Sequence, residues 1–397
     1  MTVSHHGLRV LKCNPASVSF ESPSPSTSKH VINDPDTRNA LRIATEELQR
    51  DQVIVFPTET VYGLAANALN VPAVQRIFSA KGRPSDNPLI VHVSDLAMLY
   101  TLLSPGFVLP KTYERMIDAF WPGPLTLLFP ADPTIVPSII TAGHPTVAVR
   151  MPSHPIARAL IAASRLPLAA PSANTSGSPS PTRAIHVERD LGARGKVDVI
   201  LDGGACDVGL ESTVVDGLEP DGHIRILRPG GVTVEQIERA VGSEIKVLVH
   251  KRDYSDSAIE NAPTTPGMKY RHYSPGVPVV LLVSIPRGEN SRSGEELAAV
   301  IESFTTSASR KIGMLLLDDS PLHRALRDLD APTFIHHSLG SIHEPAQAAR
   351  NLFHGLITLE QDGAETIFVE AVDETKEGLA VMNRVRKAAL HTRQVRV

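Results

Sequence analysis

The chain has 397 residues, a formal net charge of −4, 42% apolar residues and 21% charged residues. These are ordinary values for a globular protein of two or three domains, and they argue against a generally basic nucleic-acid or membrane binder. The two cysteines, Cys13 and Cys206, have no metal-like spacing, which argues against a disulfide framework or a zinc site. No apolar run approaches the roughly 18 residues that a membrane span needs.

Residues 1–34 predict a flexible leader. The first 30 residues contain one acid, Glu21, and lack the apolar core of a secretory signal. The Ser- and Pro-rich stretch "ESPSPSTSKH" at residues 21–30 is typical of disorder. We therefore expect a cytoplasmic protein, with a minor mitochondrial pool as the alternative.

Residues 35–245 predict one α/β domain in which strands and helices alternate. A helix is expected to begin near Asp36, and the apolar strand "VIVF" ends at Pro57. The other expected strands are "PLIVHV", "LTLLFP", "TVAVRMP", "LPLAAP", "VDVILDGG", "STVVDG" and "IRILRPG". Several connections are too short for helical crossovers, so we expect a twisted mixed sheet.

Residues 246–276 predict a linker, because they are polar, rich in proline and without sustained periodicity. Residues 277–397 alternate apolar strands with helices near 294–308, 321–329, 343–361 and 378–392. This pattern is typical of a smaller parallel Rossmann-like domain. It carries no G-x-G-x-x-G turn, so the sequence indicates no dinucleotide site there.

Polar side chains follow several strands of the first domain, where open α/β sheets usually bind their ligands. They lie in "PTETVYGL", in "SAKGRPSDNPLIVHV", in "TVAVRMPSHP", in "APSANTSGSPSPT", in "LESTVVD" and in "RILRPG". The cations, hydroxyl groups and small residues together predict an anion-binding cleft suited to a polyphosphate. No P-loop and no G-x-S-x-G nucleophile turn occurs, so we expect catalysis by positioning and charge neutralisation.

Each cluster also has a purely structural interpretation. Lys81 and Arg83 are compatible with cations that favour the end of a helix dipole, and His92 with a hydrogen-bonded core histidine. Arg150 alternates with apolar residues, so a buried guanidinium there needs an anion, either a ligand or a structural ion pair.

The motifs together closely resemble the YrdC-type threonylcarbamoyl-AMP synthases. The resemblance runs from about residue 35 to 242 and rests on seven ordered motifs: "PTETVYGLAANA", "KGRPSDNPLIVHV", "FWPGPLTLLF", "VAVRMPSHP", "APSANTSGSPSPT", "ESTVVD" and "ILRPG". "HYSPGVP" and the α/β tail resemble the longer, two-domain form of the enzyme.

The resemblance implies an ATP-dependent nucleotidyltransferase that condenses L-threonine with bicarbonate or CO₂. The products would be L-threonylcarbamoyladenylate and pyrophosphate, with Mg²⁺ held by the ATP phosphates and not by protein side chains. A downstream tRNA threonylcarbamoyl transferase complex would then modify the adenosine beside the anticodon of tRNAs that read codons starting with A. We allow for a weak contact with tRNA and expect no membrane partner.

The resemblance also implies roles for individual residues. Lys81 and Arg83 would stabilise the charge that develops on the phosphates. The L-threonine contacts would be Thr60, His92, Arg150, the backbone at Ala170, and Ser212. The ATP contacts would be Lys81, Arg83, Asn87, Thr146, Ser172, Asn174, Ser180, Arg228 and Tyr273. Tyr273, in "HYSP" where "HYAP" is more usual, would fold over the nucleotide as part of a lid.

Two rival functions remain open from the sequence. An RNA-binding module could use the same cationic cleft, although only 4% of the residues are aromatic and RNA-stacking surfaces need aromatics. A carbamoyltransferase related to hydrogenase maturation proteins shares the YrdC-type domain. That class carries cysteine-rich zinc fingers, which two isolated cysteines do not provide.

Overall fold

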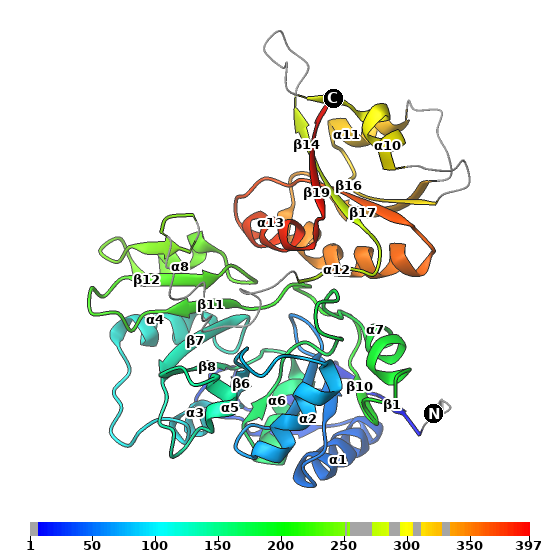
Figure 1. The fold of residues 1–397 in the computed structure, drawn as a ribbon. Coiled ribbons are helices and arrows are strands. Elements are labelled where there is room, and N and C mark those ends of the chain that lie inside the picture. The colour runs from blue at the N-terminus through cyan, green and yellow to red at the C-terminus, as the bar shows by residue number, and fades with distance from the viewer. Residues whose placement is uncertain (1–6, 251, 255–271, 286–293, 305–310, 328–333) are drawn as a thin grey trace. The chain divides into compact units, whose positions relative to one another are not determined.

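The computed structural model describes residues 7–250, 252–254, 272–285, 294–304, 311–327 and 334–397. By their contacts these residues divide into two units, drawn in Figure 1. The first unit comprises Met1–Ser176 and Ser180–Tyr270, and the second Gly177–Pro179 and Arg271–Val397, as far as they are described. The short segment Gly177–Pro179 joins the second unit because the Ser274 N–H donates to the Gly177 carbonyl over 2.9 Å.

Within its described residues, the first unit has an 11-stranded sheet in the order β1-β10-β4-β5-β9-β6-β8-β7-β11-β12-β13. Pairs such as β6 and β8 are parallel, whereas β4 and β5, β6 and β9, and β7 and β8 are antiparallel. This confirms the mixed sheet that the short connections predicted. The strands are β1 (Arg9–Lys12), β4 (Ile54–Phe56), β5 (Gly63–Asn67), β6 (Ile90–His92), β7 (Leu125–Pro130), β8 (Thr146–Arg150), β9 (Leu168–Ala169), β10 (Val199–Asp202), β11 (Thr213–Asp216), β12 (Ile224–Arg228) and β13 (Val247–Val249).

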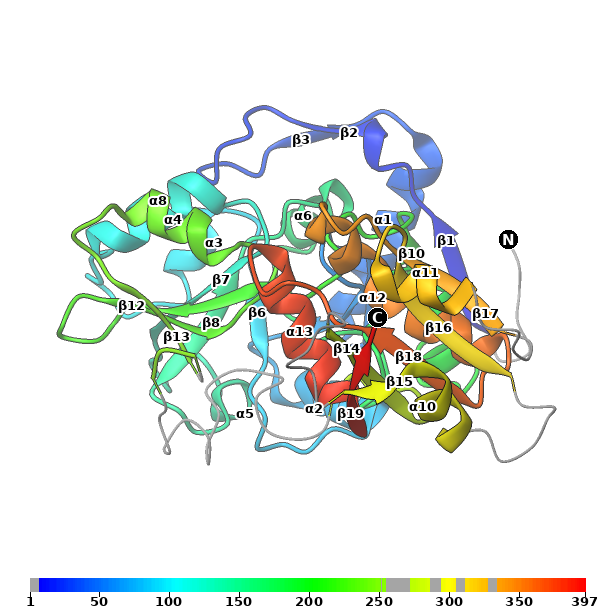
Figure 2. The ribbon, with the colours of Figure 1, turned by 90° about the horizontal axis from the view of Figure 1, so that it is seen from above.

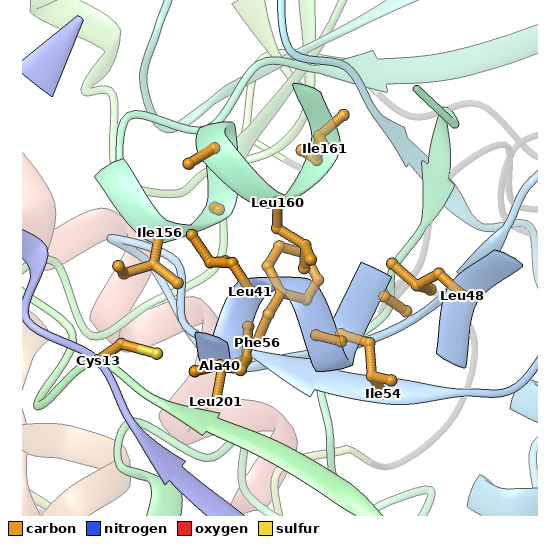
Figure 3. Close-up of a cluster of buried hydrophobic side chains, with 14 of the residues drawn as sticks. Cys13, Ala40, Leu41, Leu48, Ile54, Phe56, Ile156, Leu160, Ile161 and Leu201 are labelled. Carbon is orange, nitrogen blue, oxygen red and sulfur yellow. The ribbon is translucent and has the colours of Figure 1, made fainter. Parts of the chain in front are cut away.

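Helices cover this sheet, and several begin at residues typical of helix starts, such as a capping Asp followed by Pro. Asp34 caps α1, accepting a hydrogen bond from the Thr37 N–H over 2.8 Å, and a proline occupies the first helical position. Figure 3 shows Leu41 of α1 and Leu160 of α6 meeting above Phe56 of β4 in the core of the unit. The helices are α1 (Pro35–Gln49), α2 (Val71–Lys81), α3 (Leu96–Tyr100), α4 (Lys111–Phe120), α5 (Ser138–Thr141), α6 (Pro155–Ser164), α7 (Ala184–Val187) and α8 (Val234–Val241), with the short turns η1 (Pro15–Ser17) and η2 (Glu188–Gly192).

The predicted flexible leader is wrong for the part of it that the structure describes. Strand β1 pairs in parallel with β10 at the edge of the large sheet. Leu11 of this strand is buried in the same core as α1 and α6. Composition favoured disorder because it averages over the segment, whereas a few apolar residues and a free sheet edge are enough to order it.

The Ser- and Pro-rich stretch is also ordered, as the connection of a hairpin. Strands β2 (Val18–Phe20) and β3 (His30–Ile32) pair antiparallel, and Figure 2 shows them beside α6 and α1. The guanidinium of Arg158 from α6 lies over the Phe20 ring, 4.2 Å from its centroid, and also donates to the Thr27 carbonyl over 3.0 Å. These contacts give the Thr27 carbonyl and the Phe20 ring partners within the protein. In a disordered segment the same groups would be exposed to water.

The second unit has a six-stranded sheet within its described residues, in the order β15-β19-β14-β18-β16-β17, and every pair is parallel. Figure 1 shows α10 and α11 on one side of this sheet and α12 and α13 on the other. This confirms the predicted Rossmann-like parallel domain. Its elements are β14 (Val279–Ile285), β15 (Glu295–Glu296), α10 (Leu297–Phe304), β16 (Ile312–Leu317), α11 (Pro321–Arg327), β17 (Phe334–Gly340), α12 (Pro345–Gln361), β18 (Thr366–Glu370), α13 (Glu377–Ala388) and β19 (His391–Arg396).

The linker predicted for residues 246–276 falls largely outside the described residues. At its start, β13 pairs in parallel with β12, so the first sheet extends past residue 245. Among the described residues of the whole chain, no helix combines the length and the apolar character needed to cross a membrane.

Candidate functional site

Strands β6 and β8 form the centre of the candidate site. They run in parallel, with His92 directly beside Arg150. Side chains of neighbouring parallel strands in register point to the same face, so these two groups share one face of the sheet. Thr146 lies on that face too, four residues before Arg150 and therefore about 13 Å away along the strand. The face thus offers polar groups at both ends of one strand.

Arg150 is buried, with 4% of its surface exposed, and the protein itself supplies its anion. Its Nη2 lies 2.7 Å from Oε1 of Glu59. Its Nη1 donates to Oγ1 of Thr60 over 2.8 Å, and its Nε donates to the Gly123 carbonyl over 3.3 Å. The structural ion pair that the sequence left open is therefore present. A role toward a ligand carboxylate stays a prediction.

Glu59 and Thr60 are held in place by the turn between β4 and β5. The Thr58 hydroxyl donates to the Val61 carbonyl over 2.6 Å and lies 2.8 Å from the Thr60 hydroxyl. All three polar side chains are buried, so this turn is part of the interior and not a surface cap. The sequence missed Glu59 as a partner of Arg150, although it lies inside the quoted "PTETVYGL" motif.

His92 is buried beside Arg150 and is neutral. Burial, and then the charge of Arg150, lowers the pKa of His92 to about 3. Its ring meets the edge of the Phe56 ring, with the ring centroids 6.1 Å apart. A neutral imidazole can pack against a guanidinium without charge repulsion, which lets both groups occupy the same end of the strands.

Lys81 is the last residue of α2 and is turned inward. Gly82 follows in the left-handed conformation, with φ of 61°, and ends the helix. The Lys81 ammonium donates to the carbonyls of Ser172 and Asn174, the latter over 2.7 Å. Burial, and then the charge of Arg83, holds the pKa of Lys81 well below its usual value. An exposed cation that favours the helix dipole would show none of these features, so that interpretation is wrong.

Arg83 ties the turn that precedes β6. Its Nη2 donates to the carbonyls of Asn87 and Pro88, over 3.3 Å and 3.0 Å. The Asn87 side chain is buried as well. The sequence predicted that Arg83 and Asn87 contribute to the same site, and the structure places them in direct contact.

The strand registers bring several of the predicted nucleotide contacts toward the amino end of β6. Strands β6 and β9 pair antiparallel, with Val91 opposite Ala169. If this register is extended beyond the two strands, Ser172 falls opposite Pro88. The parallel register of β6 and β8 likewise brings Thr146 beside Pro88. Lys81 and Arg83 contact this same region, whereas His92 and Arg150 lie at the carboxyl end. Thr146, Ser172, Lys81 and Arg83 therefore lie toward the amino end of β6, and His92 and Arg150 lie at its carboxyl end.

Ala170 lies beside the first residue of β6, toward its amino end, whereas Ser212 lies near Arg150. The Ala170 N–H donates to the carbonyl of Ile90 on β6 over 3.1 Å. The hydroxyls of Ser212 and Thr126 lie 2.7 Å apart, and Thr126 is paired with Arg150 across β7 and β8. The sequence did not single out Thr126, because an isolated threonine in an apolar strand carries no signal of its own.

Arg228 and Ser180 are buried at the ends of neighbouring segments. Arg228 Nη2 donates to the carbonyl and the hydroxyl of Ser212, over 2.9 Å and 3.2 Å. The Ser180 hydroxyl donates to Oε1 of Glu211 over 2.6 Å. Arg228, predicted as a nucleotide contact, thus directly holds Ser212, a predicted threonine contact. Glu211 was not predicted, although it begins the "ESTVVD" motif.

Tyr273 belongs to the second unit and is buried there, with 5% of its surface exposed. Its ring lies 5.2 Å from the Phe353 ring, and the Arg384 guanidinium is 5.7 Å from its centroid. Its φ of 67° is unusual for a residue other than glycine. The other candidate residues lie in the first unit, so its role as part of a lid stays a prediction.

Comparisons with known proteins extend over nearly the whole chain. A family model described as "Telomere recombination" matches residues 46–230, and one described as "Threonylcarbamoyl-AMP synthase, C-terminal domain" matches residues 232–390. A threonylcarbamoyl-AMP synthase of Schizosaccharomyces pombe is 44% identical, with 94% of this chain and 95% of that protein covered. The chain belongs to the threonylcarbamoyl-AMP synthase family.

Two further comparisons with proteins of this family support the assignment. The threonylcarbamoyl-AMP synthase of Bacillus subtilis is 40% identical, with 91% of this chain and 95% of that protein covered. The crystal structure of P. abyssi Sua5 complexed with L-threonine is similar in fold, with a TM-score of 0.75 and 42% identity. The similarity covers 90% of this chain and 96% of that one, so the threonylcarbamoyl-AMP synthase fold includes both units.

Proposed function

We propose that the chain synthesises L-threonylcarbamoyladenylate from L-threonine, bicarbonate or CO₂, and ATP, with release of pyrophosphate. The names of its relatives and the L-threonine complex of P. abyssi Sua5 support this proposal. Within the chain, the supporting observation is the arrangement along β6. Buried Lys81 and Arg83 lie at one end, and Arg150 lies at the other.

L-Threonine would bind at the carboxyl end of β6 and β8. The Arg150 guanidinium has five N–H donors, and its contacts with Glu59, Thr60 and Gly123 distribute its charge over three neighbours. A threonine carboxylate would add a second anion there, and the neutral imidazole of His92 would not compete for it. Ser212 and the Ala170 backbone would border the amino acid.

ATP would bind at the amino end of the same strands. The Lys81 ammonium donates to two carbonyls there, and an incoming polyphosphate would favour its charged form over the neutral one. Asn87, Thr146, Ser172, Asn174, Ser180 and Arg228 complete the proposed nucleotide contacts. Mg²⁺ would accompany the nucleotide, bound by phosphate oxygens as is usual for this ion.

The chemistry would proceed in two steps. The deprotonated threonine amine attacks the carbon of CO₂, forming a C–N bond while one C–O π pair moves to oxygen. The nitrogen then loses a proton to water, which gives N-carboxythreonine. A carbamate oxygen then attacks the α-phosphorus of ATP, forming an O–P bond while the bond to the β-phosphate bridge breaks and pyrophosphate leaves with that electron pair. Lys81 and Arg83 would stabilise the charge on the phosphates during the second step.

The adenylate would be consumed by a downstream tRNA threonylcarbamoyl transferase complex. That complex would transfer the threonylcarbamoyl group to the adenosine beside the anticodon in tRNAs reading codons that start with A. A contact between this chain and tRNA would then be weak, since the modification occurs elsewhere.

The test is pyrophosphate release by the purified full chain supplied with ATP, Mg²⁺, L-threonine and bicarbonate, with the adenylate identified by mass spectrometry. We expect release that depends on both L-threonine and bicarbonate, and much less release with L-valine, which lacks the hydroxyl group. The absence of pyrophosphate release with all substrates present would overturn the proposal. Tight tRNA binding in that case would favour the RNA-binding alternative.

A further inference from the structure

The second unit has a pocket of about 490 Å³ at the carboxyl ends of its parallel strands. The ends of β14, β16 and β18 and the segments after β17 and β18 line it. Its walls are partly apolar, with Leu317, Ile342 and Met382 among the lining residues. A volume of this size lies within the usual range for small-molecule sites, about 300–1,000 Å³.

The strand order places this pocket where parallel sheets ordinarily bind ligands. Strands β16 and β18 are neighbours. The chain leaves β16 through α11 toward β17, at one edge of the sheet, and leaves β18 through α13 toward β19, on the other side of β14. Connections that leave neighbouring strands in opposite directions open a crevice between them, and ligands of open α/β sheets bind in such crevices.

One buried carboxyl group faces the pocket without a countercharge. Glu370 ends β18, lines the pocket and is 3% exposed. Its Oε2 accepts hydrogen bonds from the Leu317 N–H and the Ser320 hydroxyl, both over 2.9 Å. Its Oε1 has no partner among the described residues, and no described cation lies within ion-pair distance. Burial raises the pKa of Glu370 to about 7, as expected for an unpaired acid.

A second unsatisfied oxygen lies beside this carboxyl group. Glu370 is paired with Leu282 across β18 and β14, so Ser284 is its diagonal neighbour on the same face of the sheet. The Ser284 hydroxyl is buried and has no hydrogen-bond partner among the described residues, and Ser284 also lines the pocket. A carboxylate oxygen and a hydroxyl group on adjacent strands therefore lack hydrogen-bond partners among the described residues at the floor of the pocket.

Among the described residues, no ion pair joins this carboxyl group to Lys376 or Arg386, the Lys and Arg residues of the lining. Arg386 binds Glu374 through both of its terminal nitrogens, one of them over 2.8 Å. The described residues contain no group of three His, Cys, Asp or Glu side chains that could hold a metal ion. An anionic ligand would be repelled by the ionised form of Glu370, so a cationic donor is the group that fits.

We propose that this pocket binds a small organic amine, whose ammonium group donates to Glu370 and Ser284 and whose apolar part lies against Met382 and Ile342. An ammonium group carries three donors and no acceptor, so it can donate both to the carboxylate oxygen of Glu370 and to the hydroxyl oxygen of Ser284. The apolar walls favour an amine with a hydrocarbon body over a bare inorganic cation.

The test compares 2-phenylethylamine with 2-phenylethanol, which has the same body and no charge. Each is titrated into the full chain with ¹³C-labelled methionine methyl groups, and the Met382 signal is assigned with Met382→Leu. We expect the amine to bind at least about tenfold more tightly than the alcohol, the difference expected from one buried charge-assisted hydrogen bond. Equal affinities would overturn the proposal.

The variant Glu370→Gln sharpens the test. Glutamine keeps an oxygen for the Leu317 N–H and the Ser320 hydroxyl, so the local hydrogen bonds can persist. We expect the preference for the amine to disappear while the affinity for the alcohol is unchanged. The matched control, Glu302→Gln on the exposed face of α10, should keep the preference. A preference that survives in Glu370→Gln would contradict the proposal.

The pH dependence of binding tests the same group without a substitution in the pocket floor. Between about pH 6 and 8 the ionised fraction of an acid with a pKa near 7 rises about tenfold, so the amine should bind about tenfold more tightly and the alcohol equally well. The other charged or titratable groups around the floor are His323 of α11, His343 before α12, and Asp373, Glu374, Lys376 and Arg386 near α13. His343→Gln should keep the same profile. A flat profile for the amine in the unsubstituted chain would refute the role of Glu370.

Discussion

The two units place charges of opposite sign at the ends of their strands. In the first unit, buried cations such as Lys81 and Arg150 are held by carbonyl groups, hydroxyl groups and the carboxylate of Glu59. In the second unit, the buried group is the acid Glu370, and no described cation forms an ion pair with it. Both sheets have buried polar groups at the ends of their strands, so the side chains, and not the sheet type, determine the charge found there.

The two sheets also differ in which of their edges carry polar side chains. All strands of the second sheet are parallel, so their carboxyl ends form one edge and one crevice. In the mixed first sheet, β6 and β8 carry polar groups at both ends, with Thr146 at the amino end and Arg150 at the carboxyl end. The polar groups of the first sheet are therefore not confined to one edge.

The largest expected effect on stability comes from removing the carboxylate that balances Arg150. Glu59→Gln leaves a buried guanidinium without its anion, and we expect the free energy of unfolding to fall by about 3–5 kcal/mol. Urea unfolding followed by the fluorescence of Trp121, the chain's single tryptophan and buried in the first unit, measures this. Glu47→Gln, which breaks the more exposed pair with Arg9, should cost less than about 1 kcal/mol. Equal losses in the two variants would contradict the comparison.

The next largest effect concerns catalysis at the nucleotide end. Lys81→Ala or Arg83→Ala should lower adenylate formation about 100- to 1,000-fold, the usual loss when a stabilising charge or donor is removed from a transition state. Threonine-dependent pyrophosphate release measures the rate, and Trp121 emission reports whether the fold survives. Arg76→Ala, an exposed cation on the same helix, is the matched control and should be as active as the unsubstituted chain. Full activity of both site variants would refute the proposed site.

A smaller effect is expected from the acid of the second unit. Folding raises the pKa of Glu370 from 4.5 to about 7, so the folded state binds the proton more tightly than the unfolded state. The resulting stability is complete below the unfolded pKa and is lost as the pH rises through about 7, by about 3 kcal/mol in total. Hydrogen exchange of the β16 and β18 amides, corrected for intrinsic rates, should show this loss in the unsubstituted chain and not in Glu370→Gln. Identical pH dependence in both would argue against the raised pKa.

The smallest effect is expected at the proposed lid. Tyr273→Ala should impair turnover or retention of the adenylate, but it also removes the ring that packs on Phe353. Tyr273→Phe keeps that ring and removes only the hydroxyl group, so turnover should fall about fivefold, the equivalent of one hydrogen bond of about 1 kcal/mol. Unchanged kinetics in both variants would count against a lid.

Much of the fold was predictable because it rests on local patterns. Strand alternation in "TVAVRMP" placed Ala148 and Arg150 on one face, and the register with Ile90 and His92 confirms this. The ordering of residues 9–34 was not predictable, because β1 is stabilised by pairing with β10, whose Val199 lies 190 residues after its partner Arg9 in the sequence. Composition carries no information about such a partner.

The sequence alone determined the residue types of the candidate site and their family, because the motifs are contiguous and ordered along the chain. The tertiary structure decided how their charges are balanced. Lys81 donates to carbonyls that follow β9, Arg150 pairs with a carboxylate after β4, and Glu370 faces a pocket without a cation. Electrostatic energy depends on distance and burial in three dimensions, and neither quantity is written in the spacing of residues along a chain.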